Sequence, residues 1–273
     1  MSADPPADPG PAPIAAASLA APAGAAGAAD DVPPHPVLSD YYGGAADRRD
    51  FVGTIFDETS PDYDRVERFF GLGTGSWYRR QALKRAGLVR GMRVIDVGCG
   101  TGLVTREAVA LAGDPARVIG VDPSSGMRGQ AKLPTGVRLI EGSGEAIPLP
   151  DASGDFLSMG FALRHLSSLS RAFAEFHRVL APGGRVCVLE LTRPRGALAT
   201  RLLRGYMRDV VPTVAGWFSR SRRTDEVWRY YWDTIEACVD PETVMRALRE
   251  AGFADVRRHV EIGIFSEYTA TRT

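Results

Sequence analysis

The amino-acid sequence predicts an α/β protein with a doubly wound, seven-stranded, mostly parallel sheet, whose last strand is antiparallel and whose fifth strand precedes a helical insertion. Short apolar runs alternate with amphipathic stretches from Arg48 onward, a pattern typical of parallel strands joined by helices. Only a short turn around Ile262-Gly263 separates the last two runs, which indicates an antiparallel return because a parallel one needs a long crossover. The 273 residues can bury a sizeable core.

Apolar periodicity and turn residues place seven strands and two of the helices. The strands are expected over 92–97, 117–121, 136–141, 154–161, 184–191, 254–261 and 263–271. One helix is expected over 170–180, and Pro182-Gly183-Gly184 should end it. Another should run over 241–251, because Asp240 can cap it and Pro241 suits its first turn.

The amino-terminal segment differs in composition from the rest of the chain. Residues 1–47 are rich in Ala, Pro and Gly and lack apolar periodicity, so we expect a disordered tail followed by one domain over 48–273. The segment has no basic region before an apolar stretch, so we expect neither a secretory signal nor a transit peptide. No run of 18 apolar residues occurs, which argues against a spanning segment.

Charge and cysteine usage exclude several classes of protein. The formal net charge is zero, and residues 51–273 hold 31 basic against 26 acidic residues, an excess too small to indicate nucleic-acid binding. Cys99, Cys187 and Cys238 are far apart without C-x-x-C spacing, so neither a disulfide framework nor a metal site is expected. These features predict a reduced, cytoplasmic protein, and they leave its oligomeric state open.

A glycine-rich turn after the first strand is the strongest functional signal. The chain reads Asp96-Val-Gly-Cys-Gly-Thr-Gly102, and a helix follows. Glycines at such a turn let a ligand approach bare backbone beside the donors of a helix N-terminus. Asp122 ends the next strand, where a carboxylate can accept both hydroxyls of a ribose.

The spacing of these glycines distinguishes between ligands. A dinucleotide site needs a further glycine at position 103, which is Leu103, so a nicotinamide oxidoreductase is disfavoured. The D-x-G-x-G-x-G pattern resembles motif I of the class I S-adenosylmethionine-dependent methyltransferases, which have a Rossmann-like fold.

The insertion over 192–239 is too long for a simple crossover. An apolar stripe follows helical spacing, with arginines on another face; the stripe is Leu198, Leu202, Tyr206 and Val210, and the arginines are Arg201, Arg204 and Arg208. Two interpretations stand. The insertion covers the domain core, or it is a lid whose apolar lining receives a hydrophobic substrate and whose basic rim over 195–229 permits peripheral contact with anionic lipid.

Further blocks extend the resemblance to the ubiquinone/menaquinone-biosynthesis C-methyltransferase family over about residues 51–271. In chain order they are Phe56-Asp57, Tyr63-Asp64, Trp77-Tyr-Arg-Arg80, Asp122-Pro-Ser-Ser-Gly-Met127, Gly142-Ser-Gly-Glu-Ala-Ile-Pro-Leu-Pro-Asp151, Gly160-Phe-Ala-Leu-Arg-His165, Arg178-Val-Leu-Ala-Pro-Gly-Gly184, Tyr230-Tyr-Trp-Asp-Thr-Ile235 and Ala251-Gly-Phe253.

The resemblance implies a site for S-adenosylmethionine. It implies that Gly98, Gly100 and Gly102 face the methionine moiety in the loop that Asp96 opens, and that Asp122 binds the ribose. It implies further roles for residues outside this loop. These are Tyr63 over the methionine end, Met127 on the adenine, Ser143 and Glu145 beside the adenine, and Arg164 facing the acceptor ring.

The chain departs from this family at three places. Ser143-Gly-Glu145 replaces the usual Asp-Ala-Glu, and a hydroxyl accepts a hydrogen bond without charge assistance. His165 replaces the Asn that usually follows Arg164, and Ile262 to Tyr268 replaces a Gly-Gly-Ile-Val stretch. Most residues implied for the cofactor match the pattern of this family, whereas the residues implied for the acceptor depart from it.

Ring methylation of a phenol needs removal of the phenolic proton. His165 is the candidate base because an ordinary imidazole titrates near ~6.5, and Arg164 could stabilise the phenolate. The alternative for His165 is a structural histidine that caps the following helix. Glu190, at the end of the fifth strand, either contacts substrate or pairs with an arginine.

The leading hypothesis is therefore an S-adenosylmethionine-dependent methyltransferase that acts on a hydrophobic aromatic acceptor such as a quinol or phenol. Two alternatives stay open. One is an O-, N- or C-methyltransferase of a secondary metabolite, and the other is a catalytically inactive cofactor-binding partner protein.

Overall fold

A computed structural model describes residues 31–44, 47–70, 73–218 and 223–273. Its centre is a seven-stranded sheet in the order β3-β2-β1-β4-β5-β7-β6. All neighbouring strands pair in parallel except that β7 is antiparallel to both β5 and β6. The strands are β1 Val94–Val97, β2 Val118–Asp122, β3 Arg138–Glu141, β4 Gly154–Gly160, β5 Leu180–Leu191, β6 Phe253–Glu261 and β7 Phe265–Arg272. The predicted fold class is confirmed.

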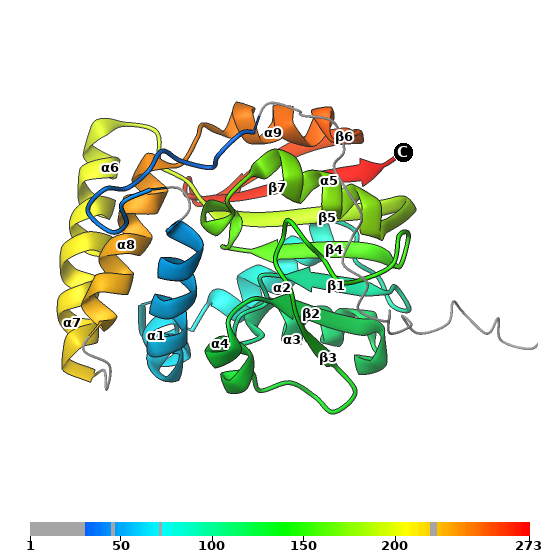
Figure 1. Cartoon of the computed structure of the whole chain (residues 1–273), viewed down its shortest axis with the longest axis horizontal. Helices are drawn as coiled ribbons and strands as arrows, with labels where there is room; N and C mark the ends of the chain where they lie inside the picture. The colour runs from blue at the N-terminus through cyan, green and yellow to red at the C-terminus, as the bar shows by residue number, and fades with distance from the viewer. Residues whose placement is uncertain (1–30, 45–46, 71–72, 219–222) are drawn as a thin grey trace, which may run out of the picture.

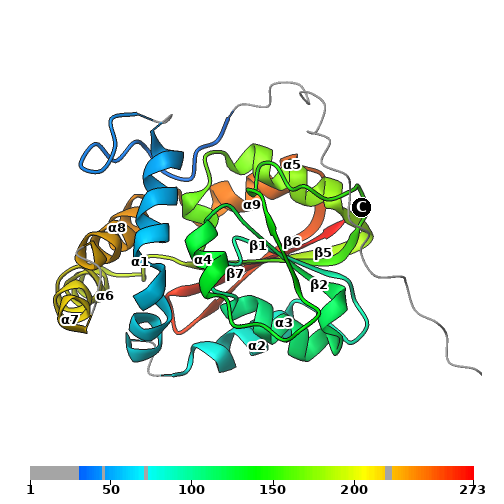
Figure 2. The same ribbon diagram turned by 60° about the horizontal axis from the view of Figure 1, so that its bottom comes forward.

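Helices cover both faces of the sheet, with α2 and α3 on one side and α5 and α9 on the other (Figure 2). The helices are α1 Arg48–Phe70, α2 Gly75–Arg85, α3 Leu103–Ala112, α4 Ser125–Gln130, α5 Leu169–Val179, α6 Ala197–Arg204, α7 Val211–Phe218, α8 Thr224–Ala237 and α9 Pro241–Glu250. Short 3₁₀ turns lie at η1 Pro115–Arg117 and η2 Leu163–His165, and a π-helical turn lies at η3 Gly205–Val210. Alternate residues of each strand point to opposite faces, so Val94 and Ile95 belong to different core clusters.

Helix α5 ends earlier than its sequence suggests. It stops at Val179, and β5 begins at once with Leu180, which pairs with Gly154. The Pro182-Gly183-Gly184 segment therefore lies within the irregular start of β5, where a bulge accommodates it. The strand tolerates this segment because Pro182-Gly183-Gly184 lies where the pairing of β5 with β4 begins.

The insertion forms a third layer of helices beside the sheet, made of α6, η3, α7 and α8, with α1 between this layer and the sheet (Figure 1). Its inner side packs into an apolar cluster that includes Leu203 and Met207. Of the stripe expected to line a lid, Tyr206 lines the cavity, but Leu198 and Leu202 are 71% and 67% exposed. For these two leucines the lid interpretation is wrong, because the helix packs the neighbouring row, Leu203 and Met207, against the protein.

Residues 31–44 are folded onto the domain, contrary to the predicted disordered tail. The carbonyl oxygens of Val32 and Pro34 accept hydrogen bonds from the amides of Leu169 and Val239. The His35 side chain is buried. We call residues 31–44 the N-terminal strap. The Ala/Pro/Gly-rich stretch 1–30 and residues 45–46 lie outside the described residues. Within the described ranges no helix is long and apolar enough to cross a bilayer.

Candidate active site

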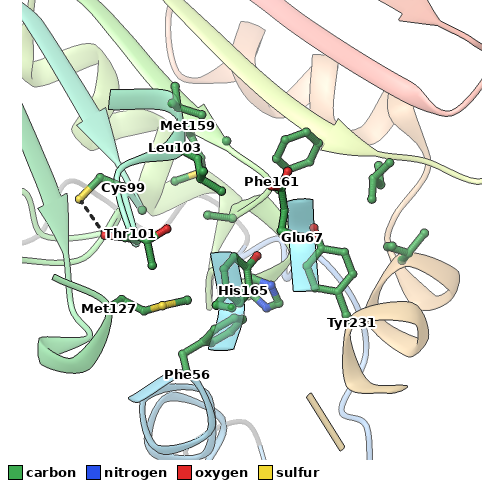
Figure 3. A pocket seen from close by; sticks show the side chains of 18 of the residues that line it. Phe56, Glu67, Cys99, Thr101, Leu103, Met127, Met159, Phe161, His165 and Tyr231 are labelled. Atoms are coloured by element: carbon green, nitrogen blue, oxygen red, sulfur yellow. Dashed lines mark hydrogen bonds between the residues drawn. The ribbon is translucent and has the colours of Figure 1, made fainter. Parts of the chain in front are cut away.

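A cavity of about 520 Å³ lies at the carboxyl edge of the parallel strands, where α/β folds bind ligands. Helices α1 and α8, the end of β4 and the β6–β7 turn also contribute to its wall. Figure 3 shows His165 between Thr101 of the glycine loop and the ring of Tyr231. The cavity thus has a polar end at the glycine loop and an aromatic end at α8.

The glycine loop has the backbone conformation that its sequence predicts. Gly98, Gly100 and Gly102 have φ angles of 65°, 53° and 84°, in the left-handed region. A Cβ at Gly98 would lie 2.6 Å from the Cβ of Ala162, whereas nothing lies within 4 Å of a Cβ at Gly100. Gly98 and Gly100 line the cavity, so a ligand can approach the bare backbone there. Gly102 packs on Leu133 and begins α3, outside the lining.

Asp122 faces the cavity and is fixed by the backbone. Its two carboxylate oxygens accept hydrogen bonds from the amides of Gly100 and Ser124, each at 2.8 Å. Each oxygen keeps a further lone pair for a ligand hydroxyl. Burial raises the pKa of this carboxyl above its ordinary value, while the two backbone donors lower it.

Asp96 does not line the cavity, and the structure assigns it another task. It is fully buried under the loop and accepts hydrogen bonds from the hydroxyls of Thr105 and Ser158, at 2.6 and 2.7 Å. These bonds tie β1 to α3 and β4. Burial raises the pKa of Asp96 to about 6.

The three residues implied for the adenine all belong to the cavity wall: Met127, Ser143 and Glu145. Met127 is buried beneath α1. The Glu145 carboxylate accepts hydrogen bonds from the amides of Ser167 and Ser168. It therefore supports the loop before α5, and Ser143 remains the polar side chain free to meet an exocyclic amine on this wall.

Helix α1 closes the cavity over the glycine loop. Tyr63 lines the cavity and stacks on Trp228 with ring centroids 5.8 Å apart. Thr101 donates a hydrogen bond to Asp64, and Asp57 accepts one from the amide of Gly126 at 2.8 Å. These two bonds attach α1 to the glycine loop and to α4.

His165 lines the cavity, and aromatic rings surround its imidazole. Its ring stacks on Tyr230, with centroids 5.6 Å apart, and meets Phe56 edge to face at 5.0 Å. Within the described chain neither ring nitrogen has a hydrogen-bond partner. Burial, then the charges of Arg164 and Arg48, hold the pKa of this imidazole well below 6.5. This direction disfavours the predicted role of His165 as a base that titrates near neutral pH.

His165 also does not cap the following helix. Ser168 caps α5 by accepting a hydrogen bond from the amide of Arg171. Both ring nitrogens are buried as well as unpaired, although the residue lines the cavity. An unpaired buried polar group is costly, so a ligand or water that reaches either nitrogen after a small turn of the ring would be favoured.

Arg164 lies behind the cavity wall and not on it. Its guanidinium forms an ion pair with Glu190 and donates to the hydroxyl of Thr234 at 3.1 Å. Its Cζ lies 3.8 Å from the ring centroid of Tyr231, a cation–π contact. Of the two roles open for Glu190, the structure shows the pairing with an arginine. Arg164 thus holds α8 against η2, and the expected direct contact with an acceptor is not seen.

Sequence reasoning missed several residues that shape this site. The aromatic wall of Phe56, Phe161 and Tyr231 lies within recognised blocks, but their spacing gave no sign of the cavity. Phe161 has a φ of 59°, in the left-handed region, which is a strained conformation for a residue other than glycine. His35 and Arg48 were missed because they reach His165 only through the fold: Arg48 donates to Nε2 of His35 at 2.7 Å and to the carbonyl oxygen of Arg164.

Comparison with known proteins decides the class of this site. Residues 44–272 match the model of the ubiE/COQ5 methyltransferase family. The chain belongs to that family. Among similar proteins are a demethylmenaquinone methyltransferase of Chlorobaculum tepidum, 33% identical over 75% of this chain and 85% of that protein, and the ubiquinone/menaquinone biosynthesis C-methyltransferase UbiE of Syntrophotalea carbinolica, 33% identical over 80% and 93%. A SAM-dependent methyltransferase structure from Thermotoga maritima covers 81% of this chain and 99% of its own, with a TM-score of 0.57 and 22% identity, which shows the shared fold.

This member of the ubiE/COQ5 family is an S-adenosylmethionine-dependent methyltransferase. Its residues fit the cofactor in three respects: the open Cβ position at Gly100, the free lone pairs of Asp122, and the presence of the Ser143 hydroxyl and the buried Met127 in the same cavity lining. The cofactor supplies an activated methyl group.

Proposed function

We propose that this methyltransferase acts on a hydrophobic aromatic acceptor, a quinol or a related phenol, in quinone biosynthesis. The observation that carries the proposal is the aromatic end of the cavity, where the unpaired imidazole of His165 lies among apolar and aromatic side chains. A flat ring with one or more hydroxyls matches that combination. The relatives named for demethylmenaquinone and ubiquinone/menaquinone methylation support the class.

In this proposal His165 is a hydrogen-bond partner for an acceptor hydroxyl. A neutral imidazole with a strongly lowered pKa takes a proton poorly. Loss of the phenolic proton must therefore be assisted by the charges of neighbouring residues. No described carboxylate pairs with Arg48, and the charge of Arg164 is offset by Glu190. The remaining positive charge favours the phenolate form of a nearby acceptor.

The residues then act by alignment. Phe56 and Tyr231 hold the ring, and His165 fixes its oxygen, so that the electron-rich ring carbon or oxygen faces the glycine loop. The cofactor, held by Gly98, Gly100 and Asp122, would supply the methyl group on a sulfonium, which would keep the electron pair of the S–C bond as the acceptor takes the methyl group. The phenolic proton leaves to solvent before this step, and a methylated ring carbon loses its own proton afterwards.

Peripheral membrane contact of the lid segment 195–229 belongs to the same proposal, since an acceptor of this class partitions into bilayers. The departure at Tyr268 gives no support to a different acceptor. Tyr268 is buried in the core on β7 and does not line the cavity.

The decisive experiment measures transfer of labelled methyl from the cofactor to demethylated quinols and simple phenols. Because neutral His165 acts as a hydrogen-bond partner, His165→Asn should keep turnover within a few-fold. His165→Phe should lower turnover by about 10–100-fold, the value of a hydrogen bond to a charged group. His177→Phe, on α5 outside the cavity, is the matched control.

The pH profile separates this role from that of a base. The lowered pKa of His165 predicts no inflection in turnover near pH ~6.5. An inflection there that disappears in His165→Asn would establish a titrating base and refute the hydrogen-bonding role. Absence of transfer to every quinol and phenol would refute the acceptor class.

A further inference from the structure

Large exposed apolar side chains surround the opening of the cavity. Trp77 on α2, Tyr206 on η3 and Ile262 in the β6–β7 turn are 62%, 39% and 78% exposed, and all three also line the cavity. They come from three elements far apart in the sequence. Their role in lining the cavity explains why one side of each residue is apolar. It does not explain why the other side is exposed to water.

The apolar rim continues along the outer face of the insertion. Leu198, Leu202, Tyr206 and Val210 follow one another at intervals of four residues, and all are exposed. Tyr206 belongs to both sets, so the stripe begins where the cavity opens. We call Trp77, Ile262 and this stripe the apolar rim. Exposed apolar patches of this continuity mark interaction surfaces.

The charges beside the apolar rim identify the kind of partner. Arg204 and Arg208 turn inward and pair with Glu236 and Asp233 of α8. Arg193, Arg195 and Arg201 are exposed beside the stripe, and no described carboxylate is in ion-pair contact with them. An apolar stripe with unpaired arginines along its edge has the composition of an interfacial amphipathic helix.

We propose that the apolar rim docks onto an anionic lipid bilayer, with the cavity opening directed at the acyl chains. This inference deepens the proposed function and rests on it in one respect: a hydrophobic acceptor would pass from the bilayer into the cavity without crossing water. Tyr206 and Trp77 have the amphipathic rings that favour the headgroup level. The arginines meet the lipid phosphates, because the negative surface potential of the bilayer attracts basic side chains.

The experiment is co-sedimentation of the full chain with vesicles of phosphatidylcholine alone and of phosphatidylcholine with an equal amount of phosphatidylglycerol. The parent protein should bind the anionic vesicles, and binding should weaken as salt is added. The double variant Leu198→Gln/Leu202→Gln should lose about tenfold or more in vesicle affinity. Neither leucine lines the cavity, so turnover on a short-chain, water-soluble quinol should be unchanged.

Two further variants test the surface and the charge. Val89→Gln is the matched control, because Val89 is 56% exposed but precedes β1 at the opposite edge of the sheet; it should bind as the parent does. Arg195→Gln/Arg201→Gln should lower affinity for anionic vesicles and leave the weaker affinity for neutral vesicles unchanged.

Three results would overturn the proposal. The parent could fail to bind anionic vesicles. The leucine variant could bind them as tightly as the parent. Sedimentation velocity could show a dimer that the leucine substitutions dissociate, which would make the stripe a contact between copies of the chain. If vesicles bind as expected but no quinol is methylated, the docking surface stands and the proposed acceptor is wrong.

Discussion

The substitution Asp122→Asn tests where the cofactor ribose lies. Asp122 ends β2 and directs both carboxylate oxygens into the polar end of the cavity, where each already accepts one backbone amide at 2.8 Å. Asparagine removes the charge and puts a donor where one oxygen accepted. A hydrogen bond to a charged group contributes about 1.5–3 kcal/mol, against about 0.5–1.5 for a neutral one.

The two hydrogen bonds to the ribose hydroxyls should therefore contribute about 1–3 kcal/mol less to the binding free energy. This corresponds to an increase of about 5–150-fold in the cofactor dissociation constant. Isothermal titration with S-adenosylmethionine, and with its demethylated product, measures this loss directly. The product lacks the sulfonium charge, so an equal loss with both ligands would place the effect at the ribose rather than at the sulfur.

Asp96→Asn is the matched control for this experiment. Asp96 lies on the neighbouring strand and is also a buried carboxylate, but its oxygens meet only the hydroxyls of Thr105 and Ser158. Its substitution should leave cofactor affinity within about twofold, since each hydroxyl can reorient to meet an amide. If Asp122→Asn bound the cofactor as the parent does, or if Asp96→Asn lost as much affinity, the assignment of the ribose to Asp122 would be refuted.

Two further predictions concern stability. The pKa of Asp96 is about 6 in the folded protein against an ordinary value of 3.8, so the unfolding free energy of the parent should fall as pH rises from about 4 to 6, by about 3 kcal/mol from this residue. Urea unfolding should show that this loss is absent in Asp96→Asn. If the unfolding free energies of the two proteins changed in parallel with pH, the contribution assigned to Asp96 would be contradicted. Removal of residues 1–30 should leave the melting temperature unchanged, whereas removal of 1–44 should lower it by several degrees, because Arg48 loses the His35 acceptor, a bond of about 1.5–3 kcal/mol. Equal melting temperatures of the two truncated proteins would show that the N-terminal strap contributes nothing.

The parts of the fold that depend on local pattern could be predicted from the sequence. The seven strands were found within a few residues, because each is a short apolar run bounded by turn residues. Helix α9 was found because Asp240 and Pro241 mark its start. The glycine loop was found because its φ angles require glycine, and a short motif carries that requirement.

The parts that depend on distant contacts could not be predicted. Asp96 and Asp122 look alike in sequence, and only the structure shows that one lies beneath the loop and the other in the cavity. The strap lacks apolar periodicity because it packs through single residues, such as His35, and through backbone carbonyls. The apolar stripe of the insertion was recognised, but periodicity does not tell which of two adjacent apolar rows faces the protein.

His165 shows that the protonation behaviour of a side chain cannot be predicted from its residue type alone. Its ordinary pKa would suit a base at neutral pH, yet the fold buries it between Phe56 and Tyr230 and brings Arg48 and Arg164 near it. Burial and positive charge both disfavour the imidazolium, but the same positive charge favours an anion. Burial, the larger effect on His165, also raises the pKa of the Tyr63, Tyr230 and Tyr231 phenols. Only the positive charge of Arg48 and Arg164 therefore favours ionisation of a bound phenol. In the proposed function, an ionised acceptor would therefore depend on that charge, and the imidazole would hold its oxygen in place.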